Sequence, residues 1–135
     1  MELSNLIKSA LKAREFSYAP ISGFRVGAAL LSKSGRVYTG CNIENASFTP
    51  TNCAERTAFF KAVSEGEREF EAIAVAGGYG EEPVDYCPPC GVCRQVMLEF
   101  CASDFTVILA KSEQDYKTYT LEELIPHSFG PSDLK

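Results

Sequence analysis

The feature that most restricts the fold of this chain is an alternation of helix-like and apolar strand-like segments in its second half. Residues 53–64 and 91–101 are rich in strong helix formers with apolar side chains at helical spacing. Between and after them lie two short apolar runs, 70–76 and 105–110, which predict strands. Strands that alternate with helices pair in parallel and are covered by those helices. We therefore expect an α/β fold.

The first half of the chain predicts a different arrangement. Residues 4–15 have apolar side chains at helical spacing, with Ser4 as the expected N-cap of a helix. Two further apolar segments, 24–31 and 36–40, are separated by the turn signal Ser34-Gly35 and predict an antiparallel hairpin. A hairpin combined with a parallel pair makes the expected sheet mixed.

The end of the chain completes this pattern without adding a second unit. We predict a strand at 117–120 and a short helix at 121–125. The chain has 135 residues, and it contains no internal repeat, low-complexity tract or linker-like segment. Compact domains usually have about 100–200 residues, so we expect one domain over residues 1–135.

The charge balance excludes some classes of partner. The chain carries 13 Lys and Arg against 18 Asp and Glu, a formal net charge of −5. Nucleic-acid binders usually carry a basic surface, so we expect no nucleic-acid partner. No apolar run approaches the roughly 18 residues of a membrane span, and Met1-Glu2-Leu3-Ser4 does not begin a secretion signal. These observations predict a cytoplasmic protein with no membrane partner.

The chain has six cysteines, at positions 41, 53, 87, 90, 93 and 101. Cytosolic thiols stay reduced, so a disulfide framework is the disfavoured interpretation, and metal binding or catalysis is favoured. Cys41 and Cys101 are expected to be small buried apolar residues. The single histidine, His127, lies in a late loop and is expected at the surface or in a capping role.

Two segments place cysteines at the starts of predicted helices. They are Cys53-Ala54-Glu55 and Pro89-Cys90-Gly91-Val92-Cys93. Residues three apart share one helical face, so Cys90 and Cys93 can hold the same ion, and Cys53 can supply a third thiolate. The positive end of a helix dipole lowers thiol pKa and favours the thiolate that metals bind. Zinc is the expected ion.

Three protein ligands leave one position of a tetrahedral ion open to a water molecule, which loses a proton near neutral pH. Glu55 is placed to accept that proton, and Arg56 to offset the negative charge of three thiolates. Two alternatives remain at this point. Cys87 could join the other three cysteines in a closed structural site, and a lone Cys-x-x-Cys pair also suits structural zinc or redox chemistry.

Several motifs, in the order found here, resemble one known family. A ligand-x-Glu segment followed by Pro-Cys-x-x-Cys is the pattern of zinc deaminases. The chain closely resembles the small homotetrameric cytidine deaminases from about Ala10 to Leu134. The motifs that carry the resemblance are FRVGAA (24–29), GCNIENA (40–46), CAERTA (53–58), PCGVCRQ (89–95) and LIP (124–126).

The resemblance implies a three-layer α/β/α sandwich with a mixed five-stranded sheet. It also implies that Cys53, Cys90 and Cys93 hold Zn²⁺ and that Glu55 transfers protons. Arg56 would hydrogen-bond to the zinc thiolates.

For the substrate, the resemblance implies a nucleoside. Asn42 and Glu44 would hold the ribose hydroxyls, and Phe24 would stack on the pyrimidine ring. The backbone of Ala54 would help to read the base. Phe129, from the tail of a neighbouring subunit in a homotetramer, would close the site.

The expected reaction is hydrolytic deamination of cytidine and 2′-deoxycytidine to the uridine products and ammonia, in pyrimidine salvage. Phe48 stands where relatives often have tyrosine, and the loop at 77–88 is long. An aminopyrimidine analogue or modified nucleoside therefore remains an alternative substrate. A non-enzymatic protein with structural zinc is another alternative, and polynucleotide editing is disfavoured because phosphate binding needs basic residues.

Overall fold

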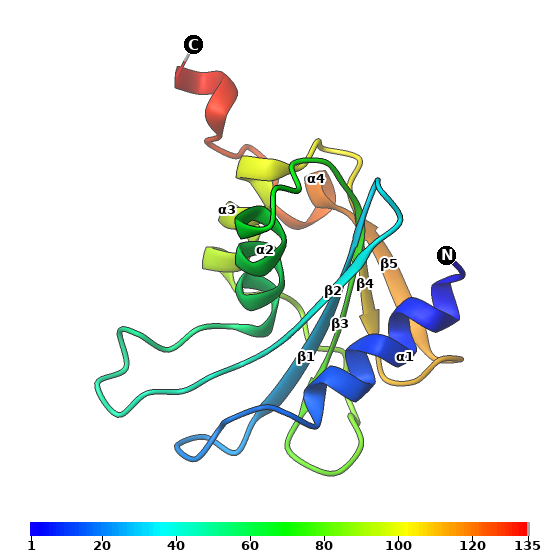
Figure 1. Cartoon of the computed structure of the whole chain (residues 1–135), viewed down its shortest axis with the longest axis vertical. Helices are drawn as coiled ribbons and strands as arrows, with labels where there is room; N and C mark the ends of the chain where they lie inside the picture. The colour runs from blue at the N-terminus through cyan, green and yellow to red at the C-terminus, as the bar shows by residue number, and fades with distance from the viewer. Residues whose placement is uncertain (135) are drawn as a thin grey trace.

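The computed structural model describes residues 1–134, so that the last residue of the predicted domain, Lys135, lies outside the described part. A five-stranded sheet lies between two layers of helices (Figure 1). The elements are α1 (Leu3–Arg14), β1 (Arg25–Ser32), β2 (Val37–Cys41), α2 (Ala54–Ser64), β3 (Phe70–Gly78), α3 (Gly91–Phe100), β4 (Thr106–Ala110), β5 (Tyr116–Thr120), α4 (Leu121–Leu124) and a 3-10 helix (Pro131–Leu134). Every predicted helix and strand is present, and the 3-10 helix was not predicted.

The sheet has the order β2-β1-β3-β4-β5 and is mixed, as predicted. β1 pairs with both β2 and β3 in antiparallel fashion, and β5 pairs in the same way with β4. β3 and β4 form the parallel pair that the helix–strand alternation indicated, with α3 as the connection between them.

The two faces of the sheet carry separate apolar clusters, which makes the fold a three-layer sandwich. Along β1, Ala28 and Leu30 pack with the α2 and α3 side, whereas Ala29 and Leu31 pack with α1. This alternation follows from the two-residue period of a strand. Figure 1 shows α1 on one side of the sheet and α2 with α3 on the other. The predicted α/β/α architecture is confirmed.

Two glycines let the helices approach the sheet closely. A Cβ at Gly27 would lie 2.1 Å from Ala10 O in α1. A Cβ at Gly40 would lie 2.5 Å from Ala54 O and 2.6 Å from Ala58 N in α2. These contacts are with backbone atoms, so the first turn of α2 rests directly on β2.

The predicted start of α1 was wrong. Ser4 lies inside the first turn, and the N-cap is Glu2, which makes no side-chain capping hydrogen bond. The helix begins earlier because Leu3 packs, partly buried, against the apolar cluster on the α1 side of the sheet. Burial of an apolar side chain outweighs the preference of serine for the cap position.

Cys41, Cys101 and His127 are not part of the possible metal-binding group found among the described residues. Cys41 and Cys101 are half-buried rather than fully buried, and Cys101 packs against the larger apolar cluster. All six cysteines are free thiols. His127 is exposed in the loop after α4, as predicted.

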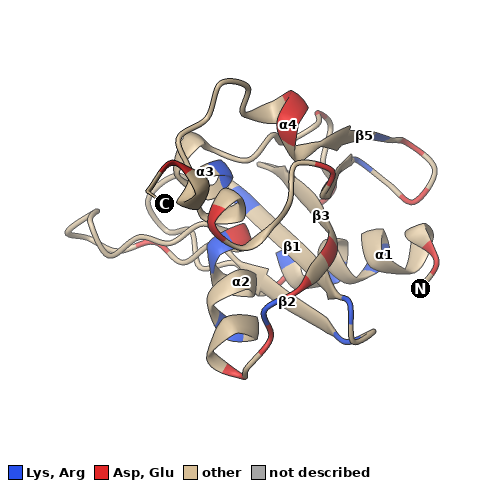
Figure 2. Ribbon diagram, turned by 90° about the horizontal axis from the view of Figure 1, so that it is seen from above, with Lys and Arg blue, Asp and Glu red and all other residues tan. Residues whose placement is uncertain are grey.

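Charge is distributed over the whole chain. Figure 2 shows Lys and Arg on several elements, interspersed with Asp and Glu. Among the described residues, no helix is both long enough and apolar enough to cross a bilayer.

Candidate active site

The cysteines predicted to bind metal converge where two helices begin. Cys53 is the N-cap of α2, Cys90 is the N-cap of α3, and Cys93 lies one turn inside α3. Neither N-cap side chain is used to cap its own helix. Their sulfurs are therefore free to bind a ligand beside the unpaired N–H groups of the two first turns.

The sulfur atoms have the separations that a tetrahedral zinc requires. Cys53 Sγ lies 3.7 Å from Cys90 Sγ, and Cys90 Sγ lies 3.6 Å from Cys93 Sγ. All three sulfurs lie within 4.8 Å of one another. Zn–S bonds of about 2.3 Å at tetrahedral angles place sulfurs about 3.8 Å apart. The donor set and its spacing thus fit a Zn²⁺ ion held by three thiolates.

Hydrogen bonds and a nearby positive charge favour the thiolate form of Cys53. A hydrogen bond from Cys93, helped by the Arg56 guanidinium, lowers the pKa of Cys53 to about 5 despite its burial. In return, the pKa of Cys93 is raised, because its thiol donates to Cys53. Arg56 Nη2 lies 3.3 Å from Cys53 Sγ, so its positive charge stabilises the thiolate directly. Burial alone would lower the pKa of Arg56, but hydrogen bonds to Cys53 and Cys93 raise it.

Cys87 does not join this cluster. The only group of possible metal ligands found among the described residues contains three cysteines and omits Cys87. Its sulfur lies beside Gly77, where an added Cβ would be only 2.8 Å away. Burial, followed by the charge of Glu55, raises the pKa of Cys87 to about 12, so this thiol stays protonated. The structure therefore argues against the four-thiolate site.

Zinc content will show which of Cys93 and Cys87 is a metal ligand. Loss of a residue that only supports a ligand lowers metal affinity by about 10- to 100-fold. We expect Cys93→Ser, which removes a ligand, to lower the affinity for zinc by more than that. A Cys87→Ser variant should keep one zinc per chain, as measured by plasma mass spectrometry after dialysis. If Cys87→Ser also lost its zinc, Cys87 would be a ligand and the three-cysteine site would be wrong.

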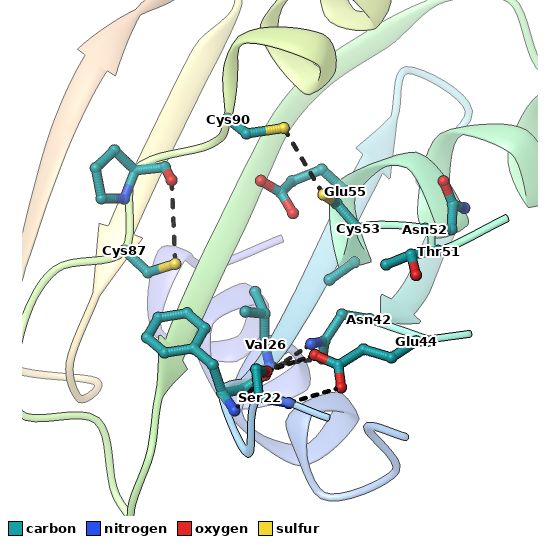
Figure 3. Close-up of a pocket in the computed structure, with 13 residues that line it drawn as sticks. Ser22, Val26, Asn42, Glu44, Thr51, Asn52, Cys53, Glu55, Cys87 and Cys90 are labelled. Carbon is teal, nitrogen blue, oxygen red and sulfur yellow. Dashed lines mark hydrogen bonds between the residues drawn. The ribbon is translucent and has the colours of Figure 1, made fainter. Parts of the chain in front are cut away.

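Glu55 is buried, and its carboxyl group lies beside Cys53 and Cys90 (Figure 3). Its side chain is only 4% exposed, although it lies in the first turn of α2. Burial raises the pKa of Glu55 to about 7, and its own backbone N–H and Arg56 offset part of that effect. A carboxyl group with this pKa can both accept and return a proton near neutral pH.

One cavity of about 270 Å³ brings together most of the predicted residues. It is lined by Ser22, Phe24, Val26, Asn42, Glu44, Thr51, Asn52, Cys53, Ala54, Glu55, Cys87, Pro88 and Cys90. Figure 3 shows Glu55, Cys53 and Cys90 on one side of this cavity and Asn42 and Glu44 on another. Small-molecule sites usually have volumes of about 300–1,000 Å³, so this cavity lies at the lower limit of that range and can hold only a small ligand.

Asn42 and Glu44 are already held in place by hydrogen bonds. Asn42 Nδ2 donates to Phe24 O at 2.7 Å, and Asn42 Oδ1 accepts from Val26 N at 2.9 Å. Glu44 accepts from the Ser22 hydroxyl and from the backbone N–H groups of Ile21 and Ser22. The contacts to Ser22 lower the pKa of Glu44, which keeps it ionised. One amide N–H of Asn42 and part of the Glu44 carboxylate remain available to a ligand.

The other predicted residues divide into two groups. Phe24 and Ala54 line the cavity, so both lie where a bound ligand would contact them. Phe129 does not: it is 62% exposed in the C-terminal tail, and its backbone oxygen accepts from Gln95 Nε2 at 2.8 Å. The cavity also contains Thr51 and Cys87, which sequence reasoning did not assign to a substrate site. The sequence drew attention to Cys87 as a possible fourth thiolate and through the length of its loop, but neither signal indicated that it lines a substrate cavity.

Comparisons with known proteins agree with this site. Residues 1–109 match the family model described as "Cytidine and deoxycytidylate deaminase zinc-binding region". The chain is 50% identical to a cytidine deaminase of Sporosarcina psychrophila over 134 residues, covering 99% of this chain and 96% of that protein. It is 52% identical to one of Halalkalibacterium halodurans over 134 residues, covering 99% and 98%.

Solved structures show the same fold. The crystal structure of cytidine deaminase from Burkholderia pseudomallei matches with a TM-score of 0.88 at 46% identity, covering 96% of this chain and all 100% of that one. The structure of cytidine deaminase from Mycobacterium tuberculosis matches with a TM-score of 0.82 at 36% identity, covering 96% and 98%. The family model and these relatives show that the chain belongs to the cytidine and deoxycytidylate deaminase family of zinc enzymes, and the cluster of Cys53, Cys90 and Cys93 agrees with this.

Proposed function

We propose that this protein deaminates cytidine and 2′-deoxycytidine to uridine and 2′-deoxyuridine, releasing ammonia. The main support is that a single cavity joins a three-thiolate cluster and a buried carboxyl group to Phe24, Asn42 and Glu44. A water-derived nucleophile, a proton carrier and sugar-binding groups are what hydrolysis of an amino group on a nucleoside requires.

The reaction needs a water molecule to replace an amino group. Zinc, held by Cys53, Cys90 and Cys93, would act as a Lewis acid that lowers the pKa of water toward neutrality. Glu55 accepts one proton of the attacking water and delivers it to ring N3 while the water oxygen bonds to C4. It then takes the proton of the new C4 hydroxyl and gives it to the amino group. The C4–N bond breaks, ammonia leaves, and the C4 oxygen becomes the carbonyl of the uridine product. The raised pKa of Glu55, about 7, suits both transfers.

Asn42 and Glu44 are proposed to hold the ribose. Their fixed hydrogen bonds to Phe24 O, Val26 N and Ser22 orient the two side chains before substrate arrives. Glu44 accepts from a hydroxyl, and Asn42 donates its remaining N–H. Cytidine and 2′-deoxycytidine share the 3′-hydroxyl, so a nucleoside that lacks this group would leave both side chains unsatisfied and would be rejected.

Phe24, Ala54 and Arg56 complete the proposed site. Phe24 contacts the pyrimidine ring, and the Ala54 backbone at the start of α2 reads the edge of the base. Arg56 reduces the charge on the Cys53 sulfur through its hydrogen bond.

The single domain over residues 1–135 is proposed to assemble as a homotetramer in the cytoplasm and to act in pyrimidine salvage. Phe129 supports this assembly, because it is exposed and does not line its own cavity, and a neighbouring copy's tail would then close each site. Light scattering should give about four times the chain mass of 14.8 kDa. A mass near that of one chain would contradict the assembly.

An ultraviolet assay of cytidine loss tests the activity. We expect turnover that a zinc chelator abolishes and that added zinc restores. The panel should include 2′-deoxycytidine, a base-modified analogue and deoxycytidylate. Among the described residues that line the cavity there are two carboxylates and no Lys or Arg, so the phosphorylated substrate should react least. A preference of more than tenfold for the analogue would overturn the assignment to cytidine.

A further inference from the structure

An aromatic pair links the cavity to the long loop that follows β3. The ring of Tyr79 meets the ring of Phe24 edge-on, with centroids 5.0 Å apart and an interplanar angle of 81°. Phe24 lines the cavity, whereas Tyr79 does not and is 73% exposed. Tyr79 therefore touches the cavity only through the Phe24 ring.

A buried arginine holds the backbone on both sides of this pair. Arg14, at the end of α1, is only 3% exposed and has no carboxylate partner among the described residues. Its Nε donates to Arg25 O at 2.9 Å, next to Phe24. Its Nη2 donates to Gly78 O and Gly80 O, the two neighbours of Tyr79, and its Nη1 donates to Glu81 O at 2.8 Å. One guanidinium thus joins the two backbone segments that carry the rings.

The same loop is anchored again at its far end. The Lys111 and Lys117 ammonium groups lie 4.5 Å and 4.7 Å from the centroid of the Tyr86 ring, and the Tyr86 hydroxyl donates to Asp115. This second attachment is to the β4–β5 connection and to the start of β5. With both ends held, Tyr79 is a fixed neighbour of Phe24 and not part of a freely moving loop.

We propose that Tyr79 and Arg14 are positioning residues that hold the Phe24 ring in the orientation that receives the pyrimidine. This inference rests on the proposed function. Phe24 precedes β1 and packs, half-buried, against the larger apolar cluster, and the Tyr79 ring adds an edge-on contact that restricts the orientation of the Phe24 ring. Ordering a side chain beforehand strengthens binding, because less conformational freedom is lost on association. The expected effect is therefore on substrate affinity and not on the chemical step.

Arginine suits this role better than lysine. A planar guanidinium has five N–H donors in a fixed arrangement and can bind several carbonyl oxygens at once. An ammonium group at the same place cannot span Arg25 O, Gly78 O and Glu81 O together. Arg14→Lys should therefore release the loop while keeping the positive charge.

Kinetics of Tyr79 variants test the proposal. Tyr79→Ala should raise KM for cytidine by about threefold to tenfold, the range that loss of one aromatic pair supports, with kcat within about twofold. Tyr79→Phe keeps the ring and should restore the wild-type KM. Val84→Ala, in the same loop and 77% exposed, is the matched control and should leave KM unchanged. An unchanged KM in Tyr79→Ala, or an equal rise in Val84→Ala, would overturn the proposal.

A double variant tests whether Arg14 acts through Tyr79. Arg14→Lys should raise KM in the same way, and combining it with Tyr79→Ala should add little, because the two changes affect one contact. If the increases in KM were additive in the double variant, Arg14 would act independently of the Tyr79–Phe24 contact. Calorimetric binding of the product uridine should weaken in the same variants. If the wild-type protein binds uridine but does not consume cytidine, the proposed function fails, whereas unaltered uridine binding in Tyr79→Ala makes the positioning role fail.

Discussion

Replacing Glu55 by glutamine should lower the turnover of cytidine by about a hundredfold to ten thousandfold, the range that one proton-transferring side chain contributes. Glutamine has nearly the shape of glutamate and fits the buried position, where the side chain is 4% exposed. It cannot accept the proton of the attacking water or return it to the ring. The thiolates of Cys53, Cys90 and Cys93 are unchanged, so zinc should remain bound.

Two measurements make this result specific. The metal content should stay at one zinc per chain, and the melting temperature should not fall, which excludes unfolding as the cause. Glu65→Gln, at the exposed C-terminal end of the same helix, is the matched control and should keep normal turnover. Wild-type turnover in Glu55→Gln would show that the assigned proton carrier is wrong.

The second large effect concerns stability. We expect Gly40→Ala to destabilise the fold by about 3 kcal/mol or more, at the upper end of the cost of overpacking. Its Cβ would lie 2.5 Å from Ala54 O and 2.6 Å from Ala58 N, and these backbone atoms cannot turn aside as a flexible side chain can. In a chain of 135 residues this cost corresponds to a fall in melting temperature of roughly 10 °C.

Gly91→Ala provides the comparison. Nothing lies within 4 Å of a Cβ built at Gly91, which begins α3, so alanine there should be neutral or slightly stabilising. Because Gly40 supports the first turn of α2, any folded Gly40→Ala protein should also bind zinc more weakly. A melting temperature equal to that of the wild type would show that α2 can move off the sheet without cost.

The local part of the site could be predicted from sequence because the chemistry depends on short spacings. Cys90 and Cys93 are three residues apart at a helix start, and Glu55 follows Cys53 by two residues. Helical geometry then determines which side chains share a face. Helix–strand alternation likewise predicted the parallel β3–β4 pair and the mixed sheet. The family motifs supplied Phe24, Asn42, Glu44 and Ala54, all of which line the cavity.

Other features required contacts between distant parts of the chain. Nothing in the sequence around Arg14 indicates that its guanidinium reaches Gly78, Gly80 and Glu81, more than sixty residues away. The prediction of Ser4 as the N-cap failed for a related reason, since packing of Leu3 against the sheet extended the helix. Local preferences are weak compared with burial of apolar surface.

The sequence by itself determined the fold class and the order of helices and strands, and it predicted Cys53, Cys90 and Cys93 as metal ligands and Glu55 as the proton carrier, with Cys87 left as a possible fourth ligand. Each of these depends on periodicity or spacing within a few residues. Only the tertiary structure showed that Cys87 lies outside the sulfur cluster, that the first turn of α2 packs directly against Gly40, and that the Tyr79 ring contacts Phe24. Those facts depend on how a strand, a helix and a loop far apart in the chain pack together, and packing is a property of the assembled layers.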